Sequence, residues 1–377
     1  MRVLRNALIF ALIMTLAFVI SACGGERTPD VTVATTTEGA VTTTEPTVTT
    51  EAVVTTTEAP VTTTLAPITS RTLVPPTDVV LPTPAVSYFE YQIQVPVFVE
   101  EENKITLEFT QADLGIGDLI LVNSNHFVAD EALLLGEMDA IYGNRVKVDG
   151  SSIYGVNGSG DKADKTAIEA INEMIMAYKK EGGDLYPVIS QAYRSIAEQD
   201  SIFREGERTY GEDTPKYYSV PGCSDYHTGL AFSFKIQKDG ANYSLSSTQA
   251  APFYNWLKEN AYKYGFIFRY PADKEQYTGI DGTAVPYQMR YVGKAHAMFM
   301  NQYNLCFEEY IDYLRGYEYG KYHLIMYFIG TQYEIFFVRN EAEVNFAEIA
   351  FDAVYEVSGN NADGYIVTIY RDLTIKE

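Results

Sequence analysis

Residues 221–236 read PGCSDYHTGLAFSFKI, and this stretch decides how the folded part of the chain is interpreted. Its second half, residues 229–236, predicts a strand, and a loop with proline, glycine and several polar residues precedes it. Upstream, residues 185–190 predict another strand, residues 192–195 a turn and residues 196–203 a short helix. The stretch therefore belongs to a segment in which strands and helices follow one another closely.

Working outward from this segment, the chain predicts helices and strands without regular alternation. Residues 166–169 (TAIE) form a capping-box pattern, and apolar Ile171, Met174, Ile175 and Tyr178 follow at helical spacing. Helices are also expected at residues 249–264, with Pro252 in the first turn, and at 294–313. Further strands are expected at residues 117–126 (leading into a loop), 265–270, 287–292, 324–329, 333–338, 349–357 and 365–370, with a tight turn at 358–364. This irregular order predicts an α+β fold with an antiparallel central sheet flanked by helices.

The N-terminal part of the chain has the features of an exported, anchored protein. Arg2 and Arg5 precede a short apolar run that ends in Ser-Ala-Cys23-Gly, which resembles the lipobox of bacterial lipoproteins, where the cysteine is acylated. The threonine-rich segment that follows cannot bury enough apolar surface to fold, and it predicts an extended spacer. We therefore expect a signal peptide at residues 1–22, a disordered stalk at 23–86, a folded domain at 87–315 and a small β-rich extension at 316–377, outside the cytoplasm and held at the membrane by lipid.

Charge and cysteine content narrow the possible partners. The formal net charge of −22 argues against nucleic acid, whose phosphates require Lys and Arg. Besides Cys23, only Cys223 and Cys306 remain. These two thiols could form a disulfide outside the cell, or they could be buried as small hydrophobic residues.

Several short motifs follow one another between about residues 110 and 315. They are residues 121–123 (LVN), 192–203 (AYRSIAEQDSIF), 221–233, 260–271 (NAYKYGFIFRYP), 278–280 (TGI), 286–293 (PYQMRYVG) and 305–310. In sequence and order these motifs resemble those of VanY-type D-alanyl-D-alanine carboxypeptidases. The resemblance implies the D-Ala-D-Ala carboxypeptidase/hedgehog-like fold and a cell-wall peptide as substrate.

In that family, zinc is held by a His and an Asp of the motif at residues 221–233 and by a His of the motif at 286–293, and a Glu just before the latter motif activates the zinc-bound water. The corresponding positions here are Tyr226, Ser233, Gln288 and Val285. Tyr and Ser are protonated near neutral pH and are poor zinc ligands, a Gln carbonyl is weak, and Val cannot transfer a proton. The motif spacing is intact, so we expect a domain that has no metal and no intact catalytic residue.

The resemblance also implies ligand-binding positions, and for each a structural role is the alternative. Arg194 would bind a peptide or its C-terminal carboxylate through two parallel hydrogen bonds, or else form an ion pair that holds the turn. His227 would replace a metal ligand only if the backbone bulges, and is otherwise exposed or hydrogen-bonded. Tyr226 and Tyr287 would contact a ligand or fill the space of the missing zinc. The full set of expected ligand-binding residues is Tyr193, Arg194, Gln199, Ser224, His227 and Arg290.

Three functions agree with these observations. The first is a non-catalytic domain that binds peptidoglycan stem peptides or an envelope protein. The second is an active D,D-carboxypeptidase or endopeptidase with a displaced metal site that includes His227. The third is a structural or signalling lipoprotein whose partner is another envelope protein and whose groove is irrelevant. We favour the first, because all four zinc and base positions are substituted within a preserved frame.

Overall fold

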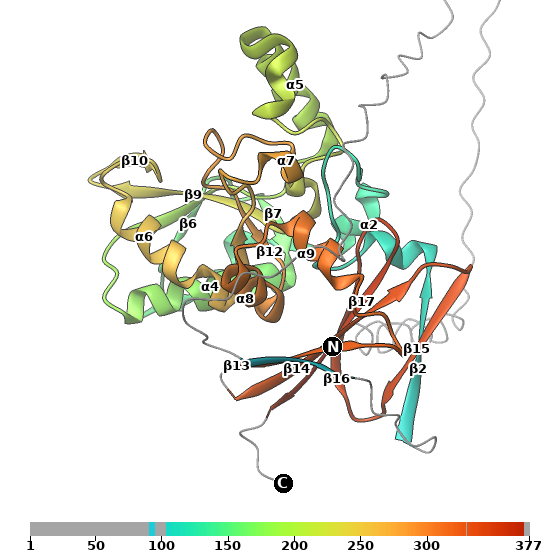
Figure 1. The fold of residues 1–377 in the computed structure, drawn as a ribbon. Coiled ribbons are helices and arrows are strands. Elements are labelled where there is room, and N and C mark those ends of the chain that lie inside the picture. Colours follow the sequence, from blue (N-terminus) through green and yellow to red (C-terminus); the bar gives the residue numbers. More distant parts are fainter. Residues whose placement is uncertain (1–89, 95–102, 329, 373–377) are drawn as a thin grey trace, which may run out of the picture. The chain divides into compact units, whose positions relative to one another are not determined.

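A computed structural model describes residues 90–94, 103–328 and 330–372 (Figure 1). Cys23 and the predicted signal peptide and stalk lie outside these residues. The predicted α+β class is confirmed: two sheets are each accompanied by helices, and one of them carries the candidate site. No helix in the described part combines the length and apolar character needed to cross a bilayer.

The sheet that carries the candidate site has the strand order β11-β12-β9-β8-β6, with β10 paired to β9. Its pairs are antiparallel except for β6 and β8, which run parallel. The predicted strands at 185–190 and 229–236 are confirmed as the central pair β8 and β9. The strands are β6 Gly155–Val156, β8 Tyr186–Gln191, β9 Ala231–Lys238, β10 Ala241–Ser244, β11 Phe266–Phe268 and β12 Met289–Tyr291.

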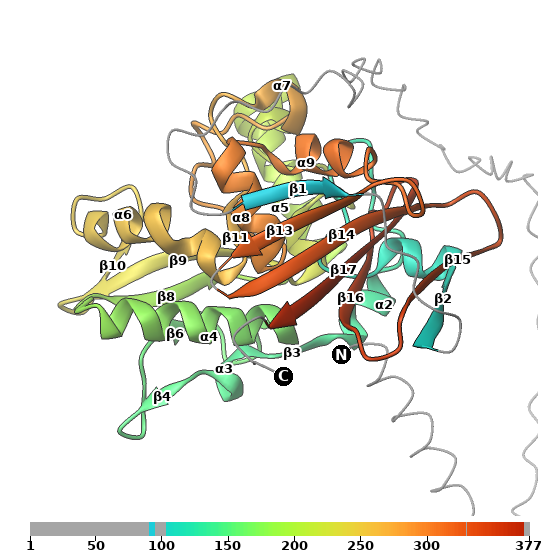
Figure 2. The ribbon, with the colours of Figure 1, turned by 60° about the horizontal axis from the view of Figure 1, so that its bottom comes forward.

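Helix α4 (Lys165–Lys180) packs along this sheet and supplies much of its core (Figure 2). Ile171 and Met174 of α4 are fully buried in one cluster with Phe232 of β9, as the helical spacing predicted. The predicted capping box at residues 166–169 was wrong, because the chain turns into the helix earlier. Asp164 is the N-cap instead, and its carboxylate accepts hydrogen bonds from the backbone of Thr166 and Ala167.

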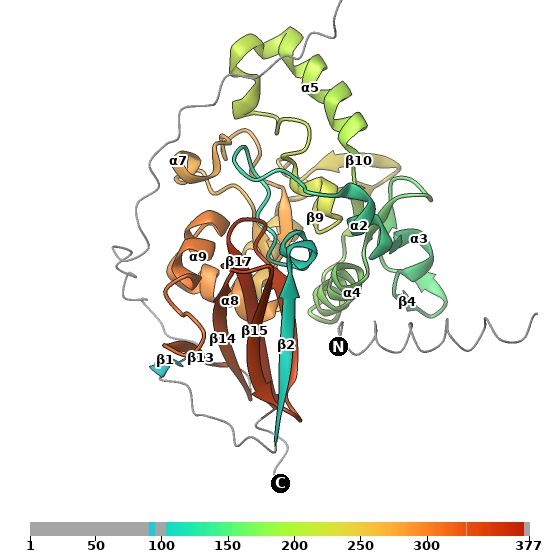
Figure 3. The same ribbon diagram turned by 90° about the vertical axis from the view of Figure 1, so that its right-hand side faces the viewer.

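The remaining helices cover the other parts of the domain. Helix α5 is longer than the predicted helix at 196–203 and stands out at one end of the domain (Figure 3). The predicted single helix at 294–313 was wrong, because Asn304 adopts the left-handed conformation (φ 50°) that ends one helix before Cys306 begins the next. The helices are α2 Glu131–Gly136, α3 Ile141–Asn144, α5 Ile196–Tyr210, η4 Gly211–Lys216, η5 Asp225–Thr228, α6 Ala251–Asn260, η6 Ala261–Tyr264, α7 Glu275–Thr278, α8 Lys294–Tyr303 and α9 Phe307–Leu314.

The C-terminal strands form a second sheet of order β1-β13-β14-β17-β16, and β15 pairs with β2 beside it (Figures 1 and 2). Apolar side chains of α8 and α9 share a core with β13, β14 and β17. Strands from before position 315 (β1 and β2) pair with strands from after it (β13 and β15). The domain boundary predicted at this position stays a prediction. The strands are β1 Glu90–Gln94, β2 Lys104–Thr110, β13 His323–Phe328, β14 Thr331–Arg339, β15 Val344–Ala350, β16 Val354–Gly359 and β17 Gly364–Asp372.

Two strand predictions in these regions were wrong. Residues 349–357 contain a turn that separates β15 from β16. Residues 117–126 form no strand, because other partners take their backbone groups: Leu119 N–H donates to Ser358 Oγ (2.8 Å), and Arg290 donates to the Ile120 carbonyl (3.1 Å). The tight turn expected at 358–364 does join β16 to β17.

The remaining short elements connect the larger ones, and η3 among them contacts β2, β16 and β17. They are η3 Gln111–Gly115, β3 Met138–Ala140, β4 Lys147–Val148, β5 Ser151–Ser152 and β7 Lys162–Asp164. Cys223 and Cys306 are buried free thiols, in agreement with the hydrophobic alternative, and burial raises the pKa of Cys223 to about 12.

Candidate functional site

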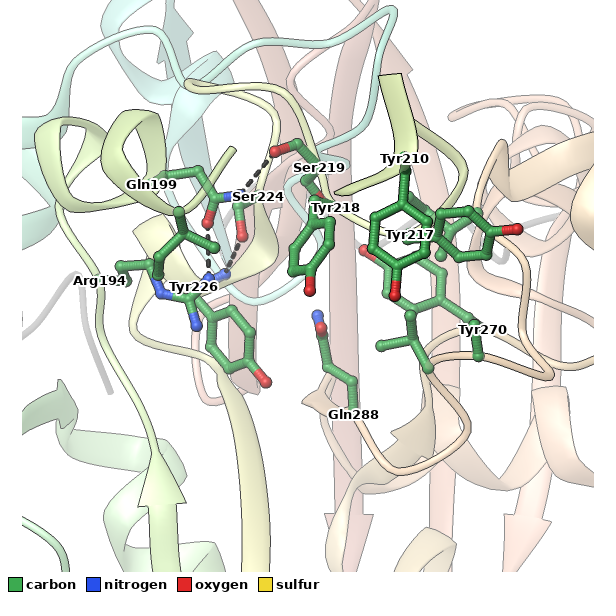
Figure 4. A pocket seen from close by; sticks show the side chains of 14 residues that line it. Arg194, Gln199, Tyr210, Tyr217, Tyr218, Ser219, Ser224, Tyr226, Tyr270 and Gln288 are labelled. Carbon is green, nitrogen blue, oxygen red and sulfur yellow. Dashed lines mark hydrogen bonds between the residues drawn. The ribbon is translucent and has the colours of Figure 1, made fainter. Parts of the chain in front are cut away.

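A pocket of about 290 Å³ opens where the turn after β8, the helix η5 and the loop before β12 meet (Figure 4). Six of the residues singled out from the sequence line it: Arg194, Gln199, Ser224, Tyr226, Val285 and Gln288. The motifs that are separate in the sequence therefore converge on one hollow.

A buried cluster of charges holds the floor of this pocket in place. The Asp225 carboxylate lies between two arginines, with 2.7 Å from Oδ2 to Arg269 Nε and 2.7 Å from Oδ1 to Arg290 Nη1. Arg269 also pairs with Glu308 at 2.6 Å, and Arg290 donates to Thr228 Oγ1 at 3.1 Å. All five side chains are buried, so the charges compensate one another away from water. Arg290 therefore lies in this cluster below the pocket and is not part of the pocket lining.

Arg194 reaches the pocket because hydrogen bonds hold its backbone against η5. Its N–H donates to the Tyr226 carbonyl (3.2 Å), and its own carbonyl accepts from His227 Nδ1 (2.7 Å). Immediately after it, Ser195 and Glu198 form a capping box that starts α5. The backbone on both sides of the Arg194 side chain is thus held rigidly.

The Arg194 guanidinium lies over the Tyr226 ring, 4.6 Å from its centroid, and Nη1 donates to Gln199 Oε1 at 2.6 Å. Gln199 in turn donates to the Ser219 carbonyl at 2.6 Å, as Figure 4 shows. Arg194 Nε is buried without a hydrogen-bond partner. Burial lowers the pKa of Arg194, which reflects the cost of placing this charge away from water.

The four positions that correspond to the family's zinc ligands and base come together in space. Tyr226, Val285 and Gln288 line the pocket, and Ser233 in β9 makes a hydrogen bond of 2.7 Å between its Oγ and the Tyr226 hydroxyl. Burial raises the pKa of Tyr226, so its hydroxyl remains protonated at neutral pH. Gln288 is only 6 % exposed, and its Nε2 has no partner.

These residues do not fit a zinc ion. A phenol, a serine hydroxyl and an amide are neutral, and two of them already bond to each other. His227 cannot complete a site in this arrangement, because Nδ1 donates to Arg194 and Nε2 accepts from Gly222 N–H at 3.2 Å. His227 is buried outside the pocket lining, and burial lowers its pKa. The described ranges contain no group of three or more His, Cys, Asp or Glu side chains able to hold a metal ion.

The other two predicted residues, Tyr193 and Tyr287, each directly precede a lining residue in the chain. The Tyr193 hydroxyl donates to Glu131 of α2 at 2.7 Å, and Tyr287 packs edge-on against Tyr254, with ring centroids 5.0 Å apart. Neither residue is part of the lining.

Sequence reasoning missed the tyrosine wall of the pocket. Tyr210, Tyr217 and Tyr218 lie at the end of α5 and after η4, with ring centroids of Tyr210 and Tyr217 4.4 Å apart, and Tyr270 faces them from beyond β11. The only signal was the high tyrosine content, 30 in the chain. Their position depends on how α5 and η4 fold back, which no local pattern indicates.

The motifs that meet at this pocket resemble those of one peptidase family, and comparisons with known proteins identify the same family. Residues 160–294 match the model of the VanY family, D-alanyl-D-alanine carboxypeptidase. A D-alanyl-D-alanine carboxypeptidase of Enterococcus faecium is 31 % identical over 276 residues, which cover 72 % of this chain and 82 % of that protein. One from Enterococcus faecalis (strain ATCC 700802 / V583) is 30 % identical over 164 residues, 41 % of this chain and 57 % of that protein.

Among solved structures, the vancomycin-resistance D,D-dipeptidase VanXYg, in complex with a D-Ala-D-Ala phosphinate analogue, aligns with a TM-score of 0.58 and 26 % identity. The alignment covers 71 % of this chain and 99 % of that one. The chain belongs to the VanY family of D-alanyl-D-alanine carboxypeptidases.

Proposed function

We propose that this domain binds the C-terminal end of peptidoglycan stem peptides without cleaving them. Family membership supports the ligand class, because similar proteins are named for D-Ala-D-Ala and one was crystallised with a D-Ala-D-Ala analogue. The observation that carries the proposal is Arg194, a cation built into the pocket with an unpaired nitrogen.

Arg194 needs an anion that the described protein does not supply. Across residues 103–328 and 330–372, no carboxylate approaches its guanidinium within the 4.0 Å of an ion pair. Within the same ranges, no Asp or Glu lines the pocket. A guanidinium can bind a carboxylate through two parallel hydrogen bonds, so a peptide C-terminus matches both its charge and its geometry.

The side chains around Arg194 support the proposed absence of catalysis. Val285 cannot accept a proton from water, and Tyr226, Ser233 and Gln288 are neutral groups that cannot activate water through a metal. The alternative, an active peptidase that uses His227, would require this histidine to give up two hydrogen bonds and leave its buried position. The hydrogen bonds of His227 thus favour the non-catalytic proposal.

We further propose that the domain acts outside the cell, attached by lipid on Cys23 and separated from the membrane by the stalk at residues 23–86. A domain that searches for peptide ends in a cell wall benefits from such a spacer, because the anchor keeps it near its ligand while the spacer extends its reach. Metabolic labelling with a fatty acid tests the anchor, since Cys23→Ala should abolish the label.

Release of D-alanine tests the catalytic question. The purified full-length chain is incubated with a pentapeptide ending in D-Ala-D-Ala, with added zinc and with chelator, beside an active member of the family. We expect no release above background and no bound zinc by elemental analysis. Chelator-sensitive release would overturn the non-catalytic proposal and make His227 the first residue to substitute.

Titration of the same peptide tests binding. Arg194→Ala removes a charged hydrogen bond and should weaken binding by about 1.5–3 kcal/mol, roughly ten- to a hundredfold. Arg204→Ala is the matched control, because Arg204 is exposed and pairs with Asp200 within helix α5, which begins just after Arg194. An unchanged affinity of Arg194→Ala for the peptide would contradict the role proposed for Arg194. Absence of peptide binding by the wild type would instead favour an envelope-protein partner that binds elsewhere. Equal unfolding free energies of both variants would show that the loss is local.

A further inference from the structure

Gln288 presents an unused hydrogen-bond donor in the pocket. Its side chain is 6 % exposed, and its Nε2 has no partner. The backbone carbonyl of Gln288 accepts a hydrogen bond from the backbone N–H of Arg269 at 2.9 Å, and β12 begins at the next residue, so the backbone position is rigid. In Figure 4 the amide end points into the space enclosed by the labelled side chains. A buried donor without an acceptor is unfavourable, so this geometry favours a ligand that supplies one.

Several polar groups near Gln288 are already hydrogen-bonded within the protein. The hydroxyls of Tyr226 and Ser233 are already bonded to each other at 2.7 Å, and Gln199 is engaged by Arg194 and by the Ser219 carbonyl. Among the described residues that line the pocket, two buried donors have no partner, the charged Arg194 Nε and the neutral Gln288 Nε2. The ligand should therefore carry a negative acceptor beside a neutral one. The carboxylate and the last amide carbonyl of a peptide have this arrangement.

We propose that Gln288 Nε2 donates to the carbonyl oxygen of the ligand's last amide bond and is thereby a specificity-determining residue for intact peptide ends. This inference rests on the proposed function above. In this arrangement the hydrogen bond stabilises the carbonyl of the uncleaved amide, and no group beside the amide transfers a proton. A free amino acid, which has no such carbonyl, should bind less well than a peptide.

The test is a coupling measurement between one side chain and one ligand atom. Gln288→Met keeps a flexible side chain of similar length and removes the donor, and Gln249→Met is the control, because Gln249 is exposed and away from the pocket. Three ligands are titrated onto the full-length chain by calorimetry: an N-acetyl-Lys-D-Ala-D-Ala peptide, its trans-alkene analogue without the last amide carbonyl, and its ester analogue, which keeps the carbonyl and lacks the N–H.

We expect Gln288→Met to weaken binding of the peptide and of the ester about three- to tenfold, the range for one neutral hydrogen bond, and to leave binding of the alkene unchanged. Equal affinities of the wild type and Gln288→Met for the peptide would overturn the inference while leaving the proposed function intact. An equal loss for the peptide and the alkene would overturn it too, because the effect would then not involve the carbonyl. If the wild type binds none of the three ligands, the proposed function itself fails.

Discussion

Replacing Asp225 by Asn removes one negative charge from between two buried guanidinium groups. In the wild type, its two carboxylate oxygens each lie 2.7 Å from an arginine nitrogen, Arg269 Nε and Arg290 Nη1. The asparagine has almost the same shape, but its NH₂ group faces a guanidinium that also only donates. The change therefore tests the charge and the acceptor, not the packing.

The two arginines differ in the hydrogen-bond partners that they keep in Asp225→Asn. Arg269 keeps Glu308, at 2.6 Å and 3.0 Å. The hydrogen bonds that Arg290 keeps within the described residues go to neutral oxygens, Thr228 Oγ1 and the backbone carbonyls of Asp118, Ile120 and Tyr291. A buried charge that loses its partner costs about 3–5 kcal/mol. Total stabilities are about 5–15 kcal/mol, so Asp225→Asn should remove a large fraction of the stability.

The assay is urea unfolding of the full-length chain, followed by tyrosine and tryptophan fluorescence and by circular dichroism. Asp213→Asn is the matched control, since Asp213 forms an exposed pair with Lys216 at 2.8 Å and the chemical change is the same. We expect a loss of about 3–5 kcal/mol for Asp225→Asn and little change for the control. If the two variants were equally stable, the buried charges could not be what holds the pocket floor, and this reasoning would be refuted.

Three further results are expected. Tyr226→Phe should destabilise the fold by about 1 kcal/mol through loss of its hydrogen bond to Ser233, and adding Ser233→Ala should cost little more, which a double-mutant cycle in urea measures. Burial lowers the pKa of His296 to about 3, so below pH 6.5 the unfolded chain takes up a proton at this residue and the folded chain does not. Between pH 7 and 5 His296 should therefore remove about 2 kcal/mol of stability, and the measured fall should be smaller by about this amount in His296→Gln. Chelator should leave Tm unchanged, because the described residues offer no metal-binding group, and a drop of several degrees would reveal a metal.

Much of the fold could be predicted from local patterns. The strands that became β8 and β9, the helix α4 and the turn between β16 and β17 follow from hydrophobic spacing and turn residues that act within a few positions. The predictions failed where residues distant in the sequence determine the backbone conformation. The sequence of residues 117–126 is typical of a strand, yet backbone groups of this segment form hydrogen bonds with Arg290, with Ser358 and with residues near Ser358.

The candidate site was likewise predicted in part from the sequence. The motifs located Arg194, Gln199, Tyr226 and Gln288, because the side chain at each matched position can be identified directly in the sequence. The predicted ligand residue Arg290 carries an equally polar side chain, but the structure places it under the pocket, paired with Asp225. A motif indicates that a residue is near a site, and only packing shows whether its side chain faces the ligand or the core.

By itself, the sequence determined which chemical groups are available: an arginine in the turn, and a tyrosine, a serine, a valine and a glutamine where the family has zinc ligands and a base. Only the tertiary structure decided which of these groups are already used. It paired Tyr226 with Ser233, occupied both nitrogens of His227 and left Arg194 and Gln288 with unsatisfied donors. The physical reason is that hydrogen bonding is a short-range property of three-dimensional neighbours, and these neighbours come from segments far apart in the chain.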